Sequence, residues 1–108
     1  MAIPESRLET ALRRIAESDE PHAELKADML RAEHAAKKTK AAIFLMAEGT
    51  VAEREARSVA SDRYNEAMED YFNAVKDFNS LNNMRDLEFV VIDAFRTLEA
   101  SRRAGNVT

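Results

Sequence analysis

Glycine and proline are so scarce in this chain that few positions remain where a helix could stop. The 108 residues include two of each, at Gly49, Gly105, Pro4 and Pro21. Turns depend on these residue types, whereas Ala, Glu, Arg, Lys and Leu favour helices and are abundant here. Hydrophobic residues make up 45% of the chain and charged residues 33%, a mixture that suits amphipathic helices. We therefore expect an all-α fold built from long helices.

The strongest stop signal lies at Gly49, near the middle of the chain. Gly49 can take the left-handed conformation that ends a helix, and Thr50 with Glu53 matches the capping box that begins one. A connection this short makes the flanking helices neighbours, usually antiparallel, so we expect a long, coiled-coil-like helical hairpin. The predicted boundaries are a single domain over 1–108, with a first arm over about 4–48, a turn at 49–50, a second arm over about 51–103 and a frayed tail over 104–108.

Three segments leave the continuity of the arms open. Either the first helix ends near Glu17 and Ser18 caps a new one, or the helix continues with a kink at Pro21. The Asn-rich segment 79–83 favours helix poorly, but it contains neither Gly nor Pro, so it reads as a weak joint and not as a turn. Residues 61–62 are either a local break or a solvent-facing part of the helix.

Apolar residues recur at heptad spacing along both arms. From Leu25 to Met46 the spacing alternates between 4 and 3, and the same alternation runs from Tyr64 to Phe78. The stripes widen around Phe44 and Phe89, beyond what a two-helix seam can cover. Self-association as a dimer or larger oligomer would bury this surface, and the alternative is a terminal helix that folds back into a bundle. The predicted interface residues are Leu25, Met29, Ile43, Phe44, Met46, Tyr71, Val75, Phe78, Phe89, Ile92 and Phe95.

Charge gives two further hypotheses. The net charge of −4 argues against a non-specific nucleic-acid binder, yet basic residues cluster on the first arm and near the C-terminus and could contact phosphates. For the first-arm cluster the alternative, which we favour, is a solvated basic face that pairs with acids of the second arm. Near the C-terminus, cations also suit the negative end of the helix dipole. The acids themselves suggest an inhibitor that presents a DNA-like surface to an enzyme. The basic residues are Arg31, Lys37, Lys38, Lys40, Arg102 and Arg103. The acidic residues are Glu53, Glu55, Asp62, Glu66, Glu69 and Asp70.

Residue patterns of known catalytic and metal sites are missing from the sequence. The chain has no Cys, which excludes disulfides, thiolate zinc sites and a cysteine nucleophile. His22 and His34 are the only histidines, and neither belongs to a Glu-x-x-His or His-x-x-x-His pair. There is no phosphate-binding Gly-rich loop and no nucleophile motif. We expect a non-enzymatic protein without cofactor or metal. We also expect a cytoplasmic protein without membrane contact, because no long apolar segment and no signal-peptide core is found.

Three stretches together resemble a known class of proteins. They are residues 18–26, with the acidic run at 18–20, residues 47–54 around the turn, and residues 95–103. The combination resembles small helical proteins encoded by tailed phages and prophages, and the resemblance spans most of the chain. It implies a bacterial host cytoplasm and carries over no catalytic or binding residue.

The leading hypothesis for function is therefore a self-associating helical adaptor or interaction protein that acts as a phage accessory factor. Two alternatives stand beside it. One is a nucleic-acid-binding accessory in phage replication or recombination, and the other is an inhibitor of a host enzyme.

Overall fold

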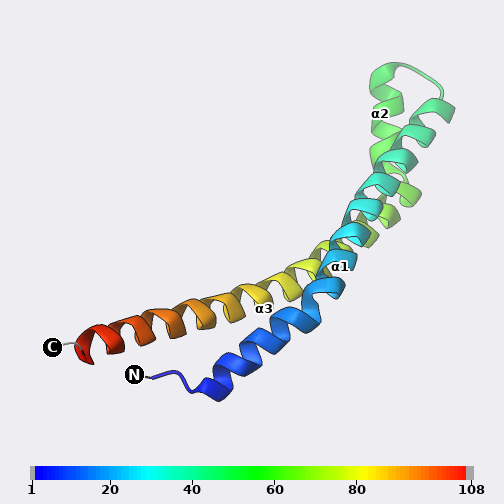
Figure 1. Cartoon of the computed structure of the whole chain (residues 1–108). Coiled ribbons are helices and arrows are strands. Elements are labelled where there is room, and N and C mark those ends of the chain that lie inside the picture. Colours follow the sequence, from blue (N-terminus) through cyan, green and yellow to red (C-terminus); the bar gives the residue numbers. More distant parts are fainter. Residues whose placement is uncertain (1, 107–108) are drawn as a thin grey trace. The chain divides into compact units, whose positions relative to one another are not determined.

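The computed structural model describes residues 2–106, and these form three helices and no strand. They are α1 (Glu5–Met46), α2 (Val51–Ala60) and α3 (Asp62–Asn106), shown in chain order in Figure 1. The prediction of an all-α chain built from a long antiparallel helical hairpin is confirmed. α3 also includes residues 104–106, which we expected to fray, while residues 107–108 lie outside the described part.

The described residues fall into two compact units. Unit 1 contains residues 2–22 and 80–106, and unit 2 contains Ala23–Asn79. Both long helices therefore contribute a segment to each unit. The boundaries coincide with the two weak points of the sequence, because Pro21 lies next to the end of the first segment and the Asn-rich segment 79–83 spans the other boundary. The expectation of one domain over the whole chain stays a prediction.

Neither weak point ends a helix. Pro21 lies inside α1, so the alternative in which the first helix stops near Glu17 is wrong. Proline lacks an N–H, which leaves the Glu17 carbonyl without its usual helical hydrogen bond. Ser18 does not cap a new helix, because its hydroxyl donates to the Arg14 carbonyl oxygen at 2.6 Å, as a serine within a helix can. By contrast Ser61 does break the second arm, with extended angles of φ −64° and ψ 136° between α2 and α3.

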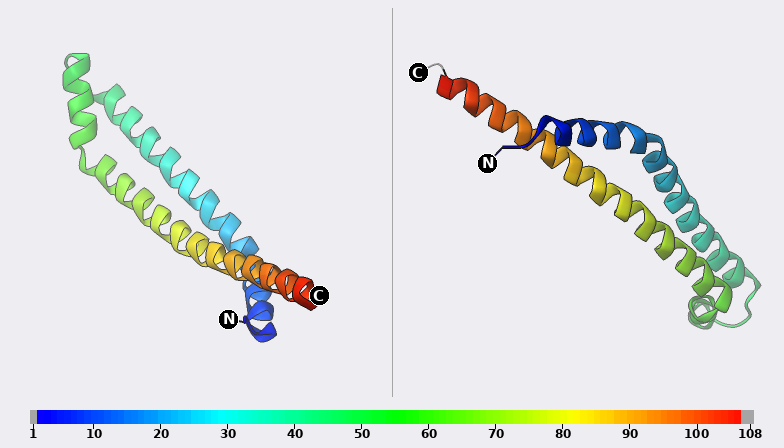
Figure 2. Two further views of the ribbon diagram at one scale, coloured as in Figure 1. Left: turned by 90° about the vertical axis from the view of Figure 1, so that its left-hand side faces the viewer. Right: turned by 90° about the horizontal axis from the view of Figure 1, so that it is seen from below.

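In unit 2 the second part of α1 runs antiparallel to the first part of α3, and α2 lies at the turn end (Figures 1 and 2). Gly49 has φ 115°, and the Glu53 N–H donates to the Thr50 hydroxyl at 3.2 Å. Arg54 ties α2 to the end of α1. Its Nε donates to the Phe44 carbonyl oxygen at 3.0 Å, and its guanidinium lies 4.2 Å from the centre of the Phe44 ring. That carbonyl belongs to the last turn of α1, where helical donors run out.

In unit 1 the contacts between α1 and α3 also follow an antiparallel order. Along α1, Arg7 contacts Glu88, Ser18 contacts Arg85, and His22 contacts Asn82. Residue numbers rise along α1 as they fall along α3, so the two helix segments run antiparallel.

The apolar core is small. Among the described residues, the buried hydrophobic side chains are Ala11, Ala36 and Ile92, whereas Ser18, Ser58, Arg85 and Glu88 are buried polar ones. In the same part of the chain, eleven large hydrophobic side chains are exposed. They are Leu12, Leu30, Leu45, Met46, Val51, Val59, Phe72, Leu87, Phe89, Val90 and Leu98.

Candidate interaction surfaces

One side of α3 in unit 1 carries no charge over residues 84–101. At about 100° of rotation per residue, every charged residue of this segment projects to the opposite side of the helix. The charged residues are Arg85, Asp86, Glu88, Asp93, Arg96 and Glu99. We call the apolar residues of the uncharged side the α3 ridge. It consists of Met84, Leu87, Val90, Val91, Ala94 and Leu98.

The α3 ridge is accessible to solvent. Leu87 is 57% exposed, Val90 61% and Leu98 38%. The neighbouring side of the helix is the one that packs on α1, and it contains the buried Glu88 and Ile92. The other three members, Met84, Val91 and Ala94, are half-buried, so the ridge is only partly exposed.

Glu88 lies at the centre of the contact between α1 and α3 in unit 1, and its side chain is fully buried. Arg7 Nη1 donates to Oε2 at 2.6 Å and Arg7 Nη2 donates to Oε1 at 2.8 Å. Arg14 Nη1 donates to Oε1 at 3.1 Å. The hydrogen bonds from Arg7 lower the pKa of Glu88, burial opposes this shift, and the hydrogen bond from Arg14 assists it. The pairing with Glu88 also raises the pKa of Arg7. A buried carboxylate needs such partners to remain charged.

Arg85, one helical turn before Glu88, makes the second polar contact of unit 1. It is buried, and its Nη1 donates to the Ile15 carbonyl oxygen at 2.9 Å and to the Ser18 hydroxyl at 2.7 Å. Its guanidinium also lies 5.9 Å from the centre of the Phe89 ring. Within the described residues no buried side-chain nitrogen or oxygen lacks a partner. The helix contact in unit 1 is therefore specified by polar groups as much as by apolar packing.

The predicted interface residues are divided between the interior and the surface. In unit 1, Ile92 is buried, Phe95 is half-buried and Phe89 is exposed. In unit 2, Met46 is 83% exposed at the turn end, and the other predicted residues are half-buried. The half-buried residues are Leu25, Met29, Ile43, Phe44, Tyr71, Val75 and Phe78. The exposed members remain candidates for contact with another chain, and the interface as a whole stays a prediction.

Two of the four first-arm basic residues lie beside acids of their own helix. Arg31 pairs with Asp28 at 3.1 Å, and Lys37 pairs with Glu33 at 2.9 Å. The second pair lowers the pKa of Glu33 and raises that of Lys37 through their hydrogen bond. These two cations thus have partners in α1 and not in the second arm, where we had expected them.

The expected pairing between the arms is present at one position. Lys40 contacts Glu55 of α2 at 2.6 Å, and this hydrogen bond raises the pKa of Lys40. Near the C-terminus, Arg102 pairs with Glu99 at 2.7 Å. Lys38 and Arg103 are exposed, and neither forms a salt bridge with another described residue.

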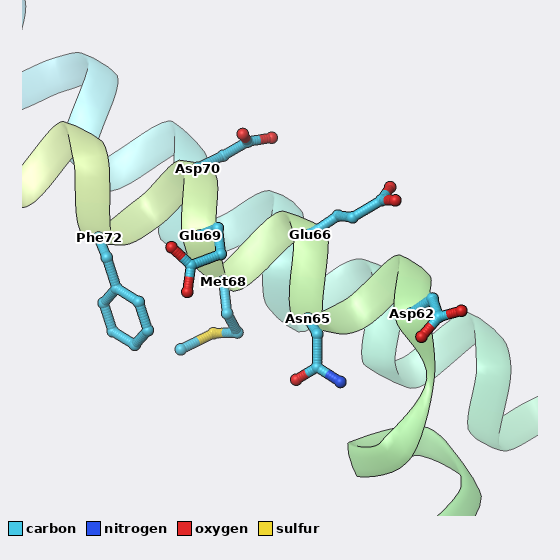
Figure 3. A pocket seen from close by; sticks show the side chains of 7 residues that line it. All are labelled: Asp62, Asn65, Glu66, Met68, Glu69, Asp70 and Phe72. Atoms are coloured by element: carbon cyan, nitrogen blue, oxygen red, sulfur yellow. The ribbon is translucent and has the colours of Figure 1, made fainter.

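Four predicted acidic residues of α3 line a shallow pocket together with Asn65, Met68 and Phe72; they are Asp62, Glu66, Glu69 and Asp70. Figure 3 shows that Glu66 and Asp70 point away from the side that carries Met68 and Phe72. The carboxylates do not converge on one point. Consistent with this, no group of three or more His, Asp or Glu side chains in the described part of the chain could hold a metal ion.

None of the helices, as far as residues 2–106 describe them, is both long and apolar enough to cross a membrane. The chain matches no protein-family model, and no curated protein or solved structure matches it either.

Proposed function

We propose that this protein is a non-enzymatic helical interaction protein that works as a self-associated assembly. The observation that carries the proposal is the imbalance between buried and exposed apolar side chains. Three hydrophobic side chains are buried among the described residues, while eleven large ones are exposed. Transfer of apolar surface out of water is the main favourable term in association, so a second layer of helices would stabilise this chain.

The charged surface that would stay exposed after self-association supports an adaptor role. Charged side chains cover much of the helical surface, and several belong to ion pairs on the surface of one helix, such as Arg31 with Asp28. Such pairs contribute little to stability and stay available to a partner. The resemblance to phage-encoded helical proteins supports an accessory role in that setting.

The experiment is the molar mass in solution, measured by size-exclusion chromatography with light scattering over a wide range of protein concentration. The chain mass is 12.2 kDa. We expect a species of at least twice this mass that persists on dilution. A mass of one chain at every concentration would overturn the proposal.

A further inference from the structure

We propose that residues 5–22 of α1, which we call the strap, detach from α3 as a separate cooperative unit while unit 2 stays folded. The strap is the part of α1 that belongs to unit 1, where it packs against residues 80–106 of α3. This inference concerns a motion within the single chain and does not rest on the proposed self-association.

Apolar packing contributes little to the contact between the strap and α3. Among the described residues of unit 1, the buried hydrophobic side chains are Ala11 and Ile92. The other buried side chains of the unit are polar, namely Ser18, Arg85 and Glu88. The free energy gained by burial scales with apolar area, and an alanine side chain offers little of it. The strap is therefore held mainly by hydrogen bonds across the two helices.

The buried Glu88 carboxylate makes this contact specific without adding much net stability. Arg7 and Arg14 both donate to it when the strap is docked. Removing such charges from water costs nearly as much free energy as their pairing returns. When the strap detaches, all three groups regain water, so the open state loses little. We therefore expect the strap to open at a lower free energy than the whole chain needs to unfold.

Unit 2 does not need the strap to stay folded. Its two arms are joined through the short connection at residues 47–50, and apolar side chains of both arms are half-buried in it, including Met29, Ile43 and Val75. The strap and residues 80–106 are separated by the whole of unit 2. Closing unit 1 in an unfolded chain therefore costs more loop entropy than closing the turn. Docking of the strap thus requires a folded unit 2, whereas the reverse does not hold.

Pro21 lies where the strap ends. Proline has no N–H, so the Glu17 carbonyl oxygen already lacks its helical hydrogen bond, and interrupting α1 there breaks fewer backbone bonds than elsewhere. Most helical stability in proteins comes from tertiary packing, and short isolated helices are only marginally stable in water. Once detached, the strap should therefore lose its helical hydrogen bonds and expose its amides to exchange.

The test is amide hydrogen exchange of the full chain at neutral pH, followed by mass spectrometry. It compares residues 9–20, in the strap, with residues 30–40, which lie in unit 2 on the same helix. Amides of the strap segment should exchange at least about tenfold faster, because they open without unit 2. Equal protection of the two segments would overturn the proposal.

Two arginine variants distinguish release of the strap from fraying of a chain end. Arg7→Gln removes the two-pronged contact with Glu88, whereas Arg13→Gln removes a strap cation that lies 3.9 Å from the exposed Glu17. Arg7→Gln should accelerate exchange in 9–20 by about tenfold or more, since it leaves a buried carboxylate short of a partner. It should leave 30–40 unchanged, and Arg13→Gln should change neither segment. Acceleration of both segments by Arg7→Gln would show that the chain opens as one unit, and acceleration of neither would show that Glu88 does not hold the strap.

Thiol labelling provides an independent readout. The chain has no cysteine, and α1 has one buried alanine in each unit, Ala11 in the strap and Ala36 in unit 2. The Ala11→Cys variant should react with a thiol reagent at least about tenfold faster than Ala36→Cys, with circular dichroism to verify that both are folded. Adding Glu88→Gln should accelerate only the reaction of Ala11→Cys. Equal labelling rates at the two positions, or equal acceleration of both, would contradict a strap that opens on its own.

Discussion

Arg7 and Glu88 lie 81 positions apart in the sequence and are joined by two hydrogen bonds, of 2.6 and 2.8 Å. A guanidinium and a carboxylate that pair in this two-pronged way fix both distance and orientation. Since Glu88 is fully buried, displacement of α1 along α3 within unit 1 would leave a buried charge without its partner. We infer that Glu88 sets the register of the helix pair in unit 1.

Glu88→Gln should therefore destabilise the fold. The amide has nearly the same shape as the carboxylate, but it cannot neutralise Arg7 and Arg14, and its NH₂ group would face their donors. We expect lower midpoints in thermal and urea unfolding followed by circular dichroism. Glu66→Gln, which changes an exposed carboxylate of the same helix, is the control and should leave both midpoints nearly unchanged. Equal effects of the two substitutions would show that the Glu88 charge does not hold the helices together.

The same carboxylate makes a prediction about pH. Pairing with Arg7 lowers the pKa of Glu88 in the folded chain, while the pKa of a Glu in the unfolded chain is about 4.3. As the pH falls below about 5, the unfolded state takes up a proton that the native state does not, so the free energy of unfolding decreases. Because glutamine does not titrate, the stability of Glu88→Gln lacks this pH-dependent contribution. The gap between the urea midpoints of wild type and Glu88→Gln should be largest near neutral pH and should narrow toward pH 3. A gap that is constant over this range would contradict the assignment.

The features that the sequence predicted correctly are those that depend on neighbouring residues. The turn could be located because Gly49, Thr50 and Glu53 act on backbone groups within a few positions of themselves. The long helices follow from the scarcity of residues that end them. The interface that heptad spacing indicated stays a prediction, because the spacing reflects the geometry of a single helix and does not say which chain covers its apolar side.

The polar centre of unit 1 could not be predicted in this way. Glu88 and Arg85 are residue types that are seldom buried, and their partners Arg7 and Ser18 lie more than 60 positions away in the sequence. The one available signal was their position just before the apolar run at 89–92, where the stripe was too wide for a simple seam. The continuity of α1 at Pro21 was also left open, because local propensity alone argues for an end there.

The two glycines of the chain should respond in opposite directions to alanine. Gly49 has φ 115°, where an L-residue is strained, and a Cβ there would lie 2.5 Å from Glu53 Oε2. Gly49→Ala should lower the free energy of unfolding by about 1–2 kcal/mol. Gly105 lies in α3, and a Cβ there would meet no atom within 4 Å. Gly105→Ala should be neutral or should stabilise the helix end, by at most about 1 kcal/mol. Urea denaturation of both variants checks this, and a neutral Gly49→Ala would show that the turn relaxes.

The ion pairs of the basic cluster predict weak binding to nucleic acid. Arg31, Lys37 and Lys40 each have a carboxylate within 3.1 Å, which leaves Lys38 as the member without a described ion pair. Fewer unpaired cations mean fewer counterions released from DNA and a shallow dependence of affinity on salt. Fluorescence anisotropy with a labelled duplex should show binding only at low ionic strength, with a slope of log K against log salt close to −1.

Two charge-reversal variants show whether any such binding is specific to the cluster. Lys38→Glu and Arg57→Glu make the same change in net charge, the second at an exposed position of α2 outside the cluster. Both should weaken the low-salt binding to a similar extent, because only the overall field matters when no site is formed. A steep salt slope that Lys38→Glu alone reduces would instead mean that phosphate displaces the acids from Lys37 and Lys40. The first arm would then be a nucleic-acid surface, and nucleic-acid binding would replace the interpretation of these cations as members of ion pairs.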